Sequence, residues 1–183
     1  NNHPIESLSQ GESGIVVLNQ SPFYAEAGGQ IGDKGLLSAE GVLFEVTDTQ
    51  SLGAAILHLG KVKEGELRCG MQVAAQVDDI RQAIRCNHSA THLLHKALQQ
   101  VLGSQVMQKG SLVDAAHLRF DFSYTESLTE EQIITIENLV NEAIRSNVPV
   151  ATSVSSLEQA QQSGAMAIFD EKYMDEVRVV TMG

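Results

Sequence analysis

The stretch Asn87-His88-Ser89-Ala90-Thr91-His92-Leu93-Leu94-His95 decides how the rest of this chain is organised. It lies in a segment with the apolar spacing of a long helix, expected from Asp78 to Leu102 and ended by Gly103. On such a helix the first two histidines are four residues apart, about 400° around the axis, and share one face. Two imidazoles so placed can reach one divalent metal, and the third competes for the same positions.

The histidines are expected at the edge of the apolar stripe of this helix. With about 100° per residue, the stripe lies at roughly 240° to 320° from His88 and the histidines at roughly 340° to 40°. They would line the rim of a cleft, where a zinc site would have apolar residues on one side and access to water on the other. The alternative is a set of boundary histidines bonded to nearby carbonyls. The stripe consists of Ile80, Ile84, Leu94, Leu98 and Leu102.

The chain before the helix has the pattern of short strands separated by glycine turns. β-Branched and aliphatic residues gather in segments 15–19, 35–38, 42–47, 54–59 and 71–77. Their spacing predicts a small glycine-rich β-barrel over residues 1–77. Residues 78–183 are predicted to form an α/β sandwich core that carries the HxxxH helix. The predicted fold class is therefore α+β.

Gly28-Gly29-Gln30 is an unusual tripeptide inside the predicted barrel. Two glycines permit backbone angles closed to other residues and let the main chain approach a ligand. The Gln30 amide can then both donate and accept. An ordinary turn is the alternative interpretation.

The chain beyond the long helix alternates strands and helices. Strands are expected at 104–109, 117–122, 149–154 and 177–181. The capping box Thr129-Glu130-Glu131-Gln132 predicts an amphipathic helix, and Ser155-Ser156 a short one. The small-residue stretch 164–167 suggests close approach to another group.

The composition indicates a globular chain with an acidic balance and one basic stretch. Its 183 residues are 43% hydrophobic, and the absence of a long apolar run argues against a membrane span. A net charge of −11 argues against a nucleic-acid partner, yet five basic residues and one acidic residue between Arg81 and Arg119 give a local +4 (5 − 1). A solvated helix face explains this island as well as RNA does. Cys69 and Cys86 lack CxxC spacing, which suits a reducing cytosol.

Several segments together resemble the editing domain of alanyl-tRNA synthetase and its free-standing relatives, the AlaX proteins. They occur in the family's order and approximate spacing and cover nearly the whole chain. The segments are Ser21 to Gln30, Asn87 to His95, Leu102-Gly103 with Gln108 to Val113, Leu118 to Phe122, and Ala165 to Met182.

This resemblance implies hydrolysis of the ester that joins a wrong amino acid, serine or glycine, to the end of the alanine tRNA. A pocket shaped for alanine cannot exclude glycine and discriminates poorly against an added hydroxyl, so a second site must correct the error. The implied partners are the acceptor end of tRNA(Ala) and the remainder of an ATP-using, cytoplasmic synthetase.

The resemblance also implies one zinc ion, bound by His88 and His92 with a later cysteine and histidine in a CxxxH arrangement. The chain ends at Met182-Gly183, where the family continues into that segment. We therefore expect a weakly metallated or metal-free fragment, with loss of activity as one consequence, because two imidazoles alone hold zinc poorly.

Side chains near the zinc helix are expected to recognise serine. Thr91 and Gln108 are the candidates from the resemblance, with Gln30 approaching from the barrel. The alternatives are a threonine bonded to its own helix backbone and two surface glutamines.

Backbone and basic groups are expected to hold the rest of the substrate. Gly28 and Gly29 would let the main chain approach it, and Lys109 and Arg119 would contact the terminal nucleotides. Such cations fix orientation rather than sequence.

Two other functions compete with editing. One is a non-catalytic module of the same fold that binds a tRNA end or a protein. The other is a metal-dependent hydrolase of unknown substrate. A glutamate directly after His88, as in HExxH proteases, is absent, because Ser89 occupies that position.

Overall fold

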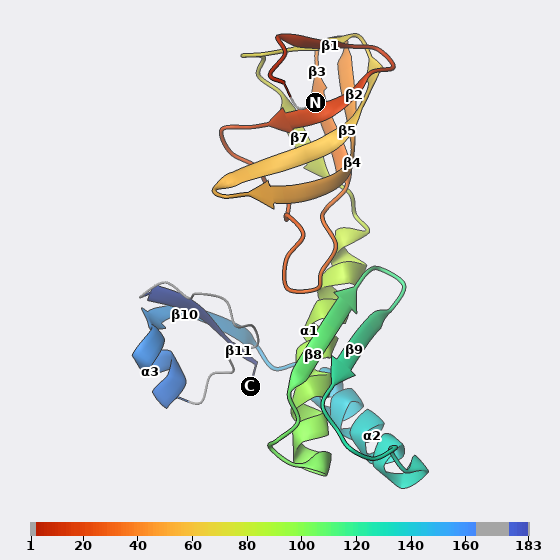
Figure 1. Ribbon diagram of the computed structural model, residues 1–183, viewed down its shortest axis with the longest axis vertical. Coiled ribbons are helices and arrows are strands. Elements are labelled where there is room, and N and C mark those ends of the chain that lie inside the picture. The colour runs from red at the N-terminus through yellow and green to blue at the C-terminus, as the bar shows by residue number, and fades with distance from the viewer. Residues whose placement is uncertain (1–2, 164–175, 183) are drawn as a thin grey trace. The chain divides into compact units, whose positions relative to one another are not determined.

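The computed structural model describes residues 3–163 and 176–182 (Figure 1). It is a mixed α/β structure in which antiparallel strands predominate and helices are few. In chain order the elements of the described residues are β1 Ser7–Ser9, β2 Ser13–Val17, β3 Gly35–Ala39, β4 Val42–Leu52, β5 Ala55–Glu64, β6 Glu66–Arg68, β7 Ala74–Val77, α1 Arg81–Leu102, β8 Gln108–Val113, β9 Leu118–Phe122, α2 Glu130–Ser146, β10 Val150–Ser156, α3 Leu157–Gln162 and β11 Glu176–Met182.

The chain forms two compact units. The first contains residues 1–88 and 111–119, and the second contains residues 89–110 and 120–183. The two segments 1–77 and 78–183 expected as domains stay a prediction.

The main feature of the first unit is a five-stranded antiparallel sheet in the order β2-β5-β4-β3-β7. Each of the five strand segments predicted from the sequence overlaps one of these strands. The central strands β4 and β5 are longer than predicted, and a short pair, β1 with β6, was not predicted. The hydrogen-bonded order begins at β2 and ends at β7, and closure into a barrel stays a prediction.

A β-bulge in the central strand changes which side chains face the core. Val42, Phe44 and Val46 alternate inward, as in a regular strand. The register with β5 then shifts between Val46 and Asp48, so the extra residue reverses the alternation. As a result Thr49 is buried on β4, fully shielded from solvent, although it is polar.

A histidine also lies in this core. His58 on β5 is fully buried; its Nδ1 lies 2.9 Å from the Val16 carbonyl and its Nε2 lies 2.7 Å from the Ser21 hydroxyl. Because the carbonyl can only accept, Nδ1 carries the proton and Nε2 accepts from Ser21. Burial lowers the pKa of His58, a shift that the bond to Val16 partly offsets.

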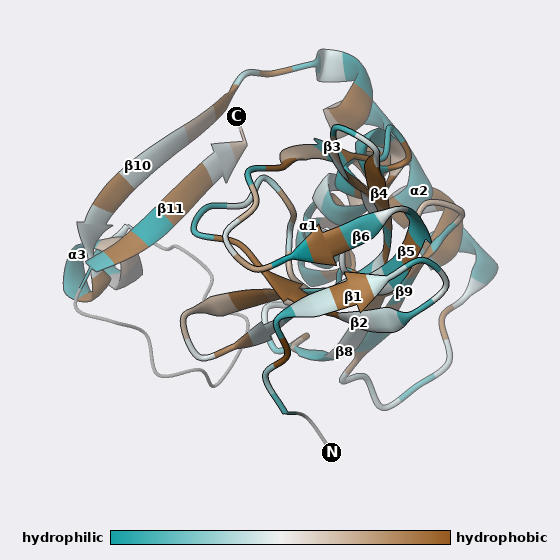
Figure 2. Ribbon diagram, turned by 90° about the horizontal axis from the view of Figure 1, so that it is seen from above, coloured by the Kyte–Doolittle hydropathy of each residue, from teal (hydrophilic) through white to brown (hydrophobic). Residues whose placement is uncertain are grey.

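The second unit has its own apolar core between helices. Ala97, Leu98 and Leu102 of α1 pack with Ile136 of α2 and with Val106. The predicted capping box of α2 is confirmed: the Thr129 hydroxyl accepts from the Gln132 N–H, and the Gln132 side chain accepts from the Thr129 N–H. Strands β10 and β11 pair in an antiparallel sheet, and β11 contains both hydrophobic and hydrophilic residues (Figure 2).

Three local expectations were wrong. Ile80, expected in the apolar stripe of the helix, is 49% exposed because it precedes the first residue of α1. The strand expected at 104–109 begins only at Gln108, because Gly103 takes a φ of 110° and the chain turns there, with the Val106 N–H bonded to the Gly103 carbonyl. His95, expected at a cleft rim, is buried against Phe120. The stretch 164–167 lies outside the described residues.

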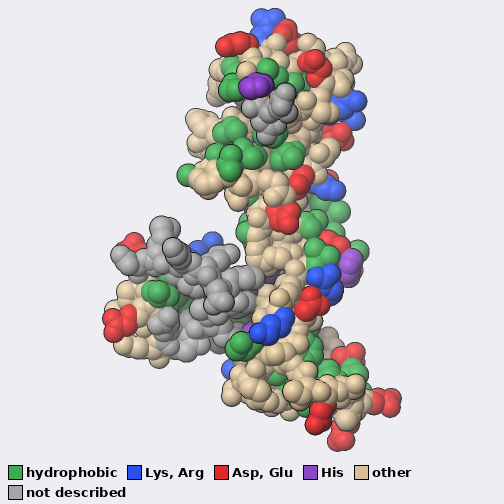
Figure 3. Space-filling model, viewed as in Figure 1, with side chains coloured by type: hydrophobic (Ala, Val, Ile, Leu, Met, Phe, Trp, Pro, Cys, Tyr) green, Lys and Arg blue, Asp and Glu red, His purple; other side chains and the backbone are tan. Residues whose placement is uncertain are grey.

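The described helices include none with the length and apolarity needed to span a membrane. Acidic side chains are prominent on the face drawn in Figure 3, in keeping with the net charge of −11.

The buried His58 predicts a pH-dependent stability. The unfolded chain binds a proton near the ordinary histidine pKa of about 6.5, whereas the folded state resists protonation. The stabilisation is therefore complete above that pH and is lost as the pH falls toward the lowered pKa. Urea unfolding between about pH 8 and about pH 5 should show a free energy that falls by up to about 1.4 kcal/mol per pH unit from this group. His58→Gln should flatten the dependence of the unfolding free energy on pH. His3→Gln, which removes an exposed histidine, is the control. Equal slopes for His58→Gln and the parent would contradict the assignment.

Candidate functional site

The loop between β2 and β3 turns sharply at Gly28-Gly29. Their φ angles are 60° and 81°, and Ala27 and Gln30 exchange backbone hydrogen bonds of 3.0 and 3.2 Å. Two central residues with positive φ between such a pair make a type I′ turn, which glycine adopts without steric cost. The ordinary turn, given above as the alternative interpretation of this tripeptide, is confirmed.

Residues 111–113 of β8 hold this turn. The Val113 N–H donates to the Gly29 carbonyl at 2.7 Å, and the Ile31 N–H donates to the Val113 carbonyl at 3.2 Å. A Cβ at Gly29 would lie 2.7 Å from the Ser111 carbonyl oxygen, so only glycine fits. The close approach that Gly29 permits is thus made to the chain's own backbone, and contact of Gly28 or Gly29 with a substrate stays a prediction.

Gln30 emerges from the turn and reaches the HxxxH helix. Its side chain is buried, with 4% of the residue exposed, and its Oε1 lies 2.7 Å from Nδ1 of His88 on α1. An amide oxygen only accepts, so Nδ1 carries the ring proton and the lone pair of the neutral ring is on Nε2. The glutamine loop and the histidine helix, 58 residues apart in sequence, therefore meet at one hydrogen bond.

The surroundings of His88 favour a neutral ring. The side chain is half-buried, and this burial lowers the pKa of His88 below that of an ordinary histidine. A neutral imidazole with a fixed Nδ1 proton is the form that binds metals through Nε2 or accepts a proton there. The arrangement can act as a metal ligand or as a general base.

The other predicted site residues occupy different depths. Thr91 is buried, His92 and Gln108 are half-buried, and Lys109 and Arg119 are exposed. His88 and His92 both lie on α1, one helical turn apart. Within the described ranges 3–163 and 176–182, three or more His, Cys, Asp or Glu side chains do not gather as a metal site requires. A shared metal stays a prediction.

One groove in the described part of the chain lies away from these residues. It has a volume of about 530 Å³ and is lined mainly by polar residues, among them Lys34, Glu45, Gln76, Asp78 and Asp79. The predicted site residues are absent from its lining, whereas Gln30 and His88 are joined by a hydrogen bond.

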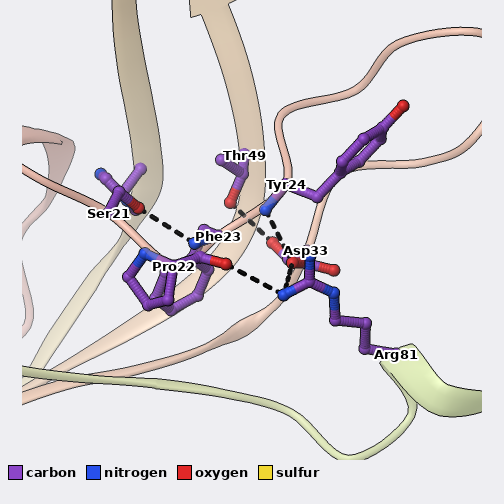
Figure 4. Close-up of polar contacts among 8 residues, drawn as sticks. Ser21, Pro22, Phe23, Tyr24, Asp33, Thr49 and Arg81 are labelled. Carbon is purple, nitrogen blue, oxygen red and sulfur yellow. Dashed lines mark hydrogen bonds and ion pairs between the residues drawn. The ribbon is translucent and has the colours of Figure 1, made fainter. Parts of the chain in front are cut away.

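Sequence reasoning missed one ion pair, in which the carboxylate is buried and the guanidinium is partly exposed. Asp33, 1% exposed, lies near the end of the loop between β2 and β3, residues 18–34, which we call the glycine loop. Its Oδ2 is 3.3 Å from Nη1 of Arg81 at the start of α1 (Figure 4). One signal was available: a cation in the first turn of a helix is disfavoured by the helix dipole, and a nearby carboxylate would offset that cost. The identity of that partner could not be read from the sequence.

Comparison with known proteins gives consistent matches. Residues 1–81 match the family described as class II (A) tRNA synthetases. Alanine–tRNA ligases of Legionella pneumophila (strain Corby) and Pseudomonas syringae pv. tomato are each 54% identical to the chain over 180 residues, and that of Nitrosococcus oceani is 55% identical. These alignments cover 98% of the chain and 21% of each relative.

The chain is thus homologous to alanine–tRNA ligases, and its N-terminal part to class II tRNA synthetases. It spans about a fifth of the length of the relatives that it matches. The 180 residues aligned with the ligases include both the glycine loop and the HxxxH helix.

The packing of Gly29 against Ser111 predicts an unusually costly substitution. Gly29→Ala adds the strain of a positive φ, about 1 kcal/mol, and an overlap with the Ser111 backbone, for a total loss of about 2–3 kcal/mol in unfolding free energy. Gly70→Ala is the matched control, since its φ of 79° is nearly the same and open space surrounds it. Urea unfolding of both variants measures the difference, and equal losses would contradict the close approach.

Proposed function

We propose that this chain is the editing part of an alanine–tRNA ligase. In this role it hydrolyses the ester of tRNA(Ala) mischarged with serine or glycine, in the cytoplasm, with the rest of the ligase as its partner. Homology to alanine–tRNA ligases over 98% of the chain supports the assignment. The single observation that most supports the assignment is the hydrogen bond between Gln30 and His88, because it brings the side chains of the two motifs together at one place.

The reaction that we propose is the hydrolysis of one ester. Water adds to the carbonyl carbon, the bond to the ribose oxygen breaks, and that oxygen takes a proton. The products are the free amino acid and an uncharged tRNA. Gln30 keeps the ring proton of His88 on Nδ1, so the ring presents Nε2 to a metal or to a reacting proton.

Zinc is the cofactor that we propose for His88 and His92. The donor chemistry fits, since a histidine that binds a metal through one ring nitrogen typically donates the N–H of the other nitrogen to an acceptor, as His88 does to Gln30. The described residues do not supply enough ligands for a complete zinc site. The remaining ligands would therefore come from outside the described residues. Bound zinc would polarise the ester carbonyl or lower the pKa of a bound water.

Discrimination between serine and alanine requires polar groups that alanine leaves unpaired. Thr91 on α1, with 4% of the residue exposed, and Gln108 at the start of β8 are our candidates for contacts to the serine hydroxyl. Each polar group left unpaired by alanine would cost about 1–3 kcal/mol. The exposed cations of Lys109 and Arg119 would hold phosphates of the acceptor end.

A non-catalytic module is the second candidate. The lack of a third metal ligand among the residues that the structure describes favours it. Such a module would bind the acceptor end without turnover, so the two candidates differ in the release of amino acid rather than in affinity.

A deacylation assay tests the proposal directly. Ser-tRNA(Ala), Gly-tRNA(Ala) and Ala-tRNA(Ala) are offered to the chain alone and to the chain grafted into a full-length alanine–tRNA ligase in place of its own segment. We expect release of serine and glycine but not of alanine, at least in the grafted form. Stable Ser-tRNA(Ala) and Gly-tRNA(Ala) in both forms would reject editing and leave the binding module.

Two substitutions test the residues within that assay. His88→Ala should abolish deacylation, and Gln30→Ala should lower it about 10–100-fold because the orienting partner of the histidine is lost. Gln10→Ala, which removes an exposed glutamine bonded only to the Lys63 carbonyl, is the matched control. Unchanged turnover in Gln30→Ala would remove that residue from the mechanism.

A further inference from the structure

The glycine loop touches α1 at two points on one face of the helix. Asp33 meets Arg81, and Gln30 meets His88. The two helix residues are seven apart, about 700° around the axis and so within about 20° of the same direction, and about 10 Å apart along it. The loop residues are three apart, so one short segment lies along two turns of the helix.

Arg81 holds the loop by more than its charge. Its Nη1 donates to the Pro22 carbonyl at 2.9 Å and lies 3.3 Å from Oδ2 of Asp33, so one nitrogen bridges the beginning and the end of the loop (Figure 4). The same Oδ2 accepts the Tyr24 N–H at 2.7 Å, and the Asp33 N–H donates to the Tyr24 carbonyl. These two hydrogen bonds join residues 24 and 33 and close the segment 24–33, which includes Gln30, into a ring.

The sheet fixes the position of Asp33. The buried Thr49 hydroxyl donates to the Asp33 carbonyl at 2.7 Å, and a Cβ on the neighbouring Gly32 would lie 2.2 Å from the Thr49 carbonyl oxygen. The following residue, Lys34, accepts the Asp78 N–H just before α1. The aspartate therefore stands at a rigid corner where the sheet, the loop and the helix start are bonded together.

The ion pair itself is poorly suited to stability alone. Oδ1 of Asp33 and Nε of Arg81 are buried without a hydrogen-bond partner among the described residues. Asp33 is buried and the Arg81 side chain is 33% exposed, so the cost of removing the carboxylate from water offsets much of the attraction between the charges. What the pair supplies is a defined position of the loop relative to the helix.

We infer that Asp33 and Arg81 are positioning residues that hold Gln30 against His88 and thereby keep the His88 proton on Nδ1. Both act on His88 through Gln30, which bonds the ring. The inference rests on the proposed function for its effect on turnover, whereas its effect on the ring proton can be measured without any substrate. The loss of the pair loosens the ring 24–33, and the glutamine then no longer selects one tautomer.

Long-range ¹H–¹⁵N spectra of the histidine rings test this inference. They are recorded on the 183-residue chain at about pH 8, where histidine is neutral. His88→Ala identifies the His88 signals among those of the six histidines. The parent chain should show Nδ1 protonated and Nε2 unprotonated. Asp33→Asn and Arg81→Lys should shift His88 toward a mixture of both tautomers.

Arg85→Ala is the matched control, because Arg85 is an exposed arginine on the same helix, four residues after Arg81 and three before His88. It should leave the tautomer of His88 unchanged. Arg81→Lys keeps the positive charge near Asp33, but its shorter side chain does not place a nitrogen where Nη1 contacts both loop ends, so this variant tests the inference even if Arg81→Ala does not fold. A single Nδ1–H tautomer in folded Asp33→Asn and Arg81→Lys, or an equal change in Arg85→Ala, would overturn the inference.

The turnover of Ser-tRNA(Ala) in the grafted ligase supplies the second readout. Arg81→Lys should lower kcat about tenfold with little change in KM, because the histidine is misoriented while the binding groups remain. A parent protein that does not deacylate, together with a tautomer that responds to Arg81→Lys, would reject editing and leave the positioning role intact. A change in KM alone would reject the link between positioning and turnover.

Discussion

A single hydrogen bond, from Nδ1 of His88 to Oε1 of Gln30 at 2.7 Å, is the interaction on which the site depends. It connects a loop of the five-stranded sheet to the helix that carries the HxxxH pattern. Because the amide oxygen can only accept, the bond selects one tautomer of the ring, and burial keeps that ring neutral. The chemistry available to His88 is therefore set by a residue 58 positions away.

The loop can provide this bond only because its backbone is held along its length. Gly28 and Gly29 form a tight turn, β8 residues bond to that turn, and the absence of a side chain at Gly29 allows the contact. At the other end, Thr49 bonds the backbone of Asp33, and it points inward because a bulge in β4 reverses the alternation. Local irregularities in the sheet thus serve the geometry of the site.

The sequence predicted much of the secondary structure and part of the site. Periodicity located α1 and the five strands of the main sheet, since helix and strand periods are local properties of the chain. The capping box located the start of α2 for the same reason. Prediction from the sequence failed where the outcome depended on distant residues or on the length of a turn. His95 is covered by Phe120, and the strand after Gly103 begins late because the turn there is longer than glycine alone indicates.

The sequence by itself determined that two histidines share a helical turn, that Gly28-Gly29 forms a turn and that Gln30 follows it, because these features depend on neighbours in the chain. The tertiary structure alone decided that Gln30 meets His88, that Gly29 packs on Ser111 and that Asp33 pairs with Arg81. Those contacts join segments separated by 48 to 82 positions in the printed sequence. Their geometry depends on the register of a sheet and on one bulge, which composition and spacing do not encode.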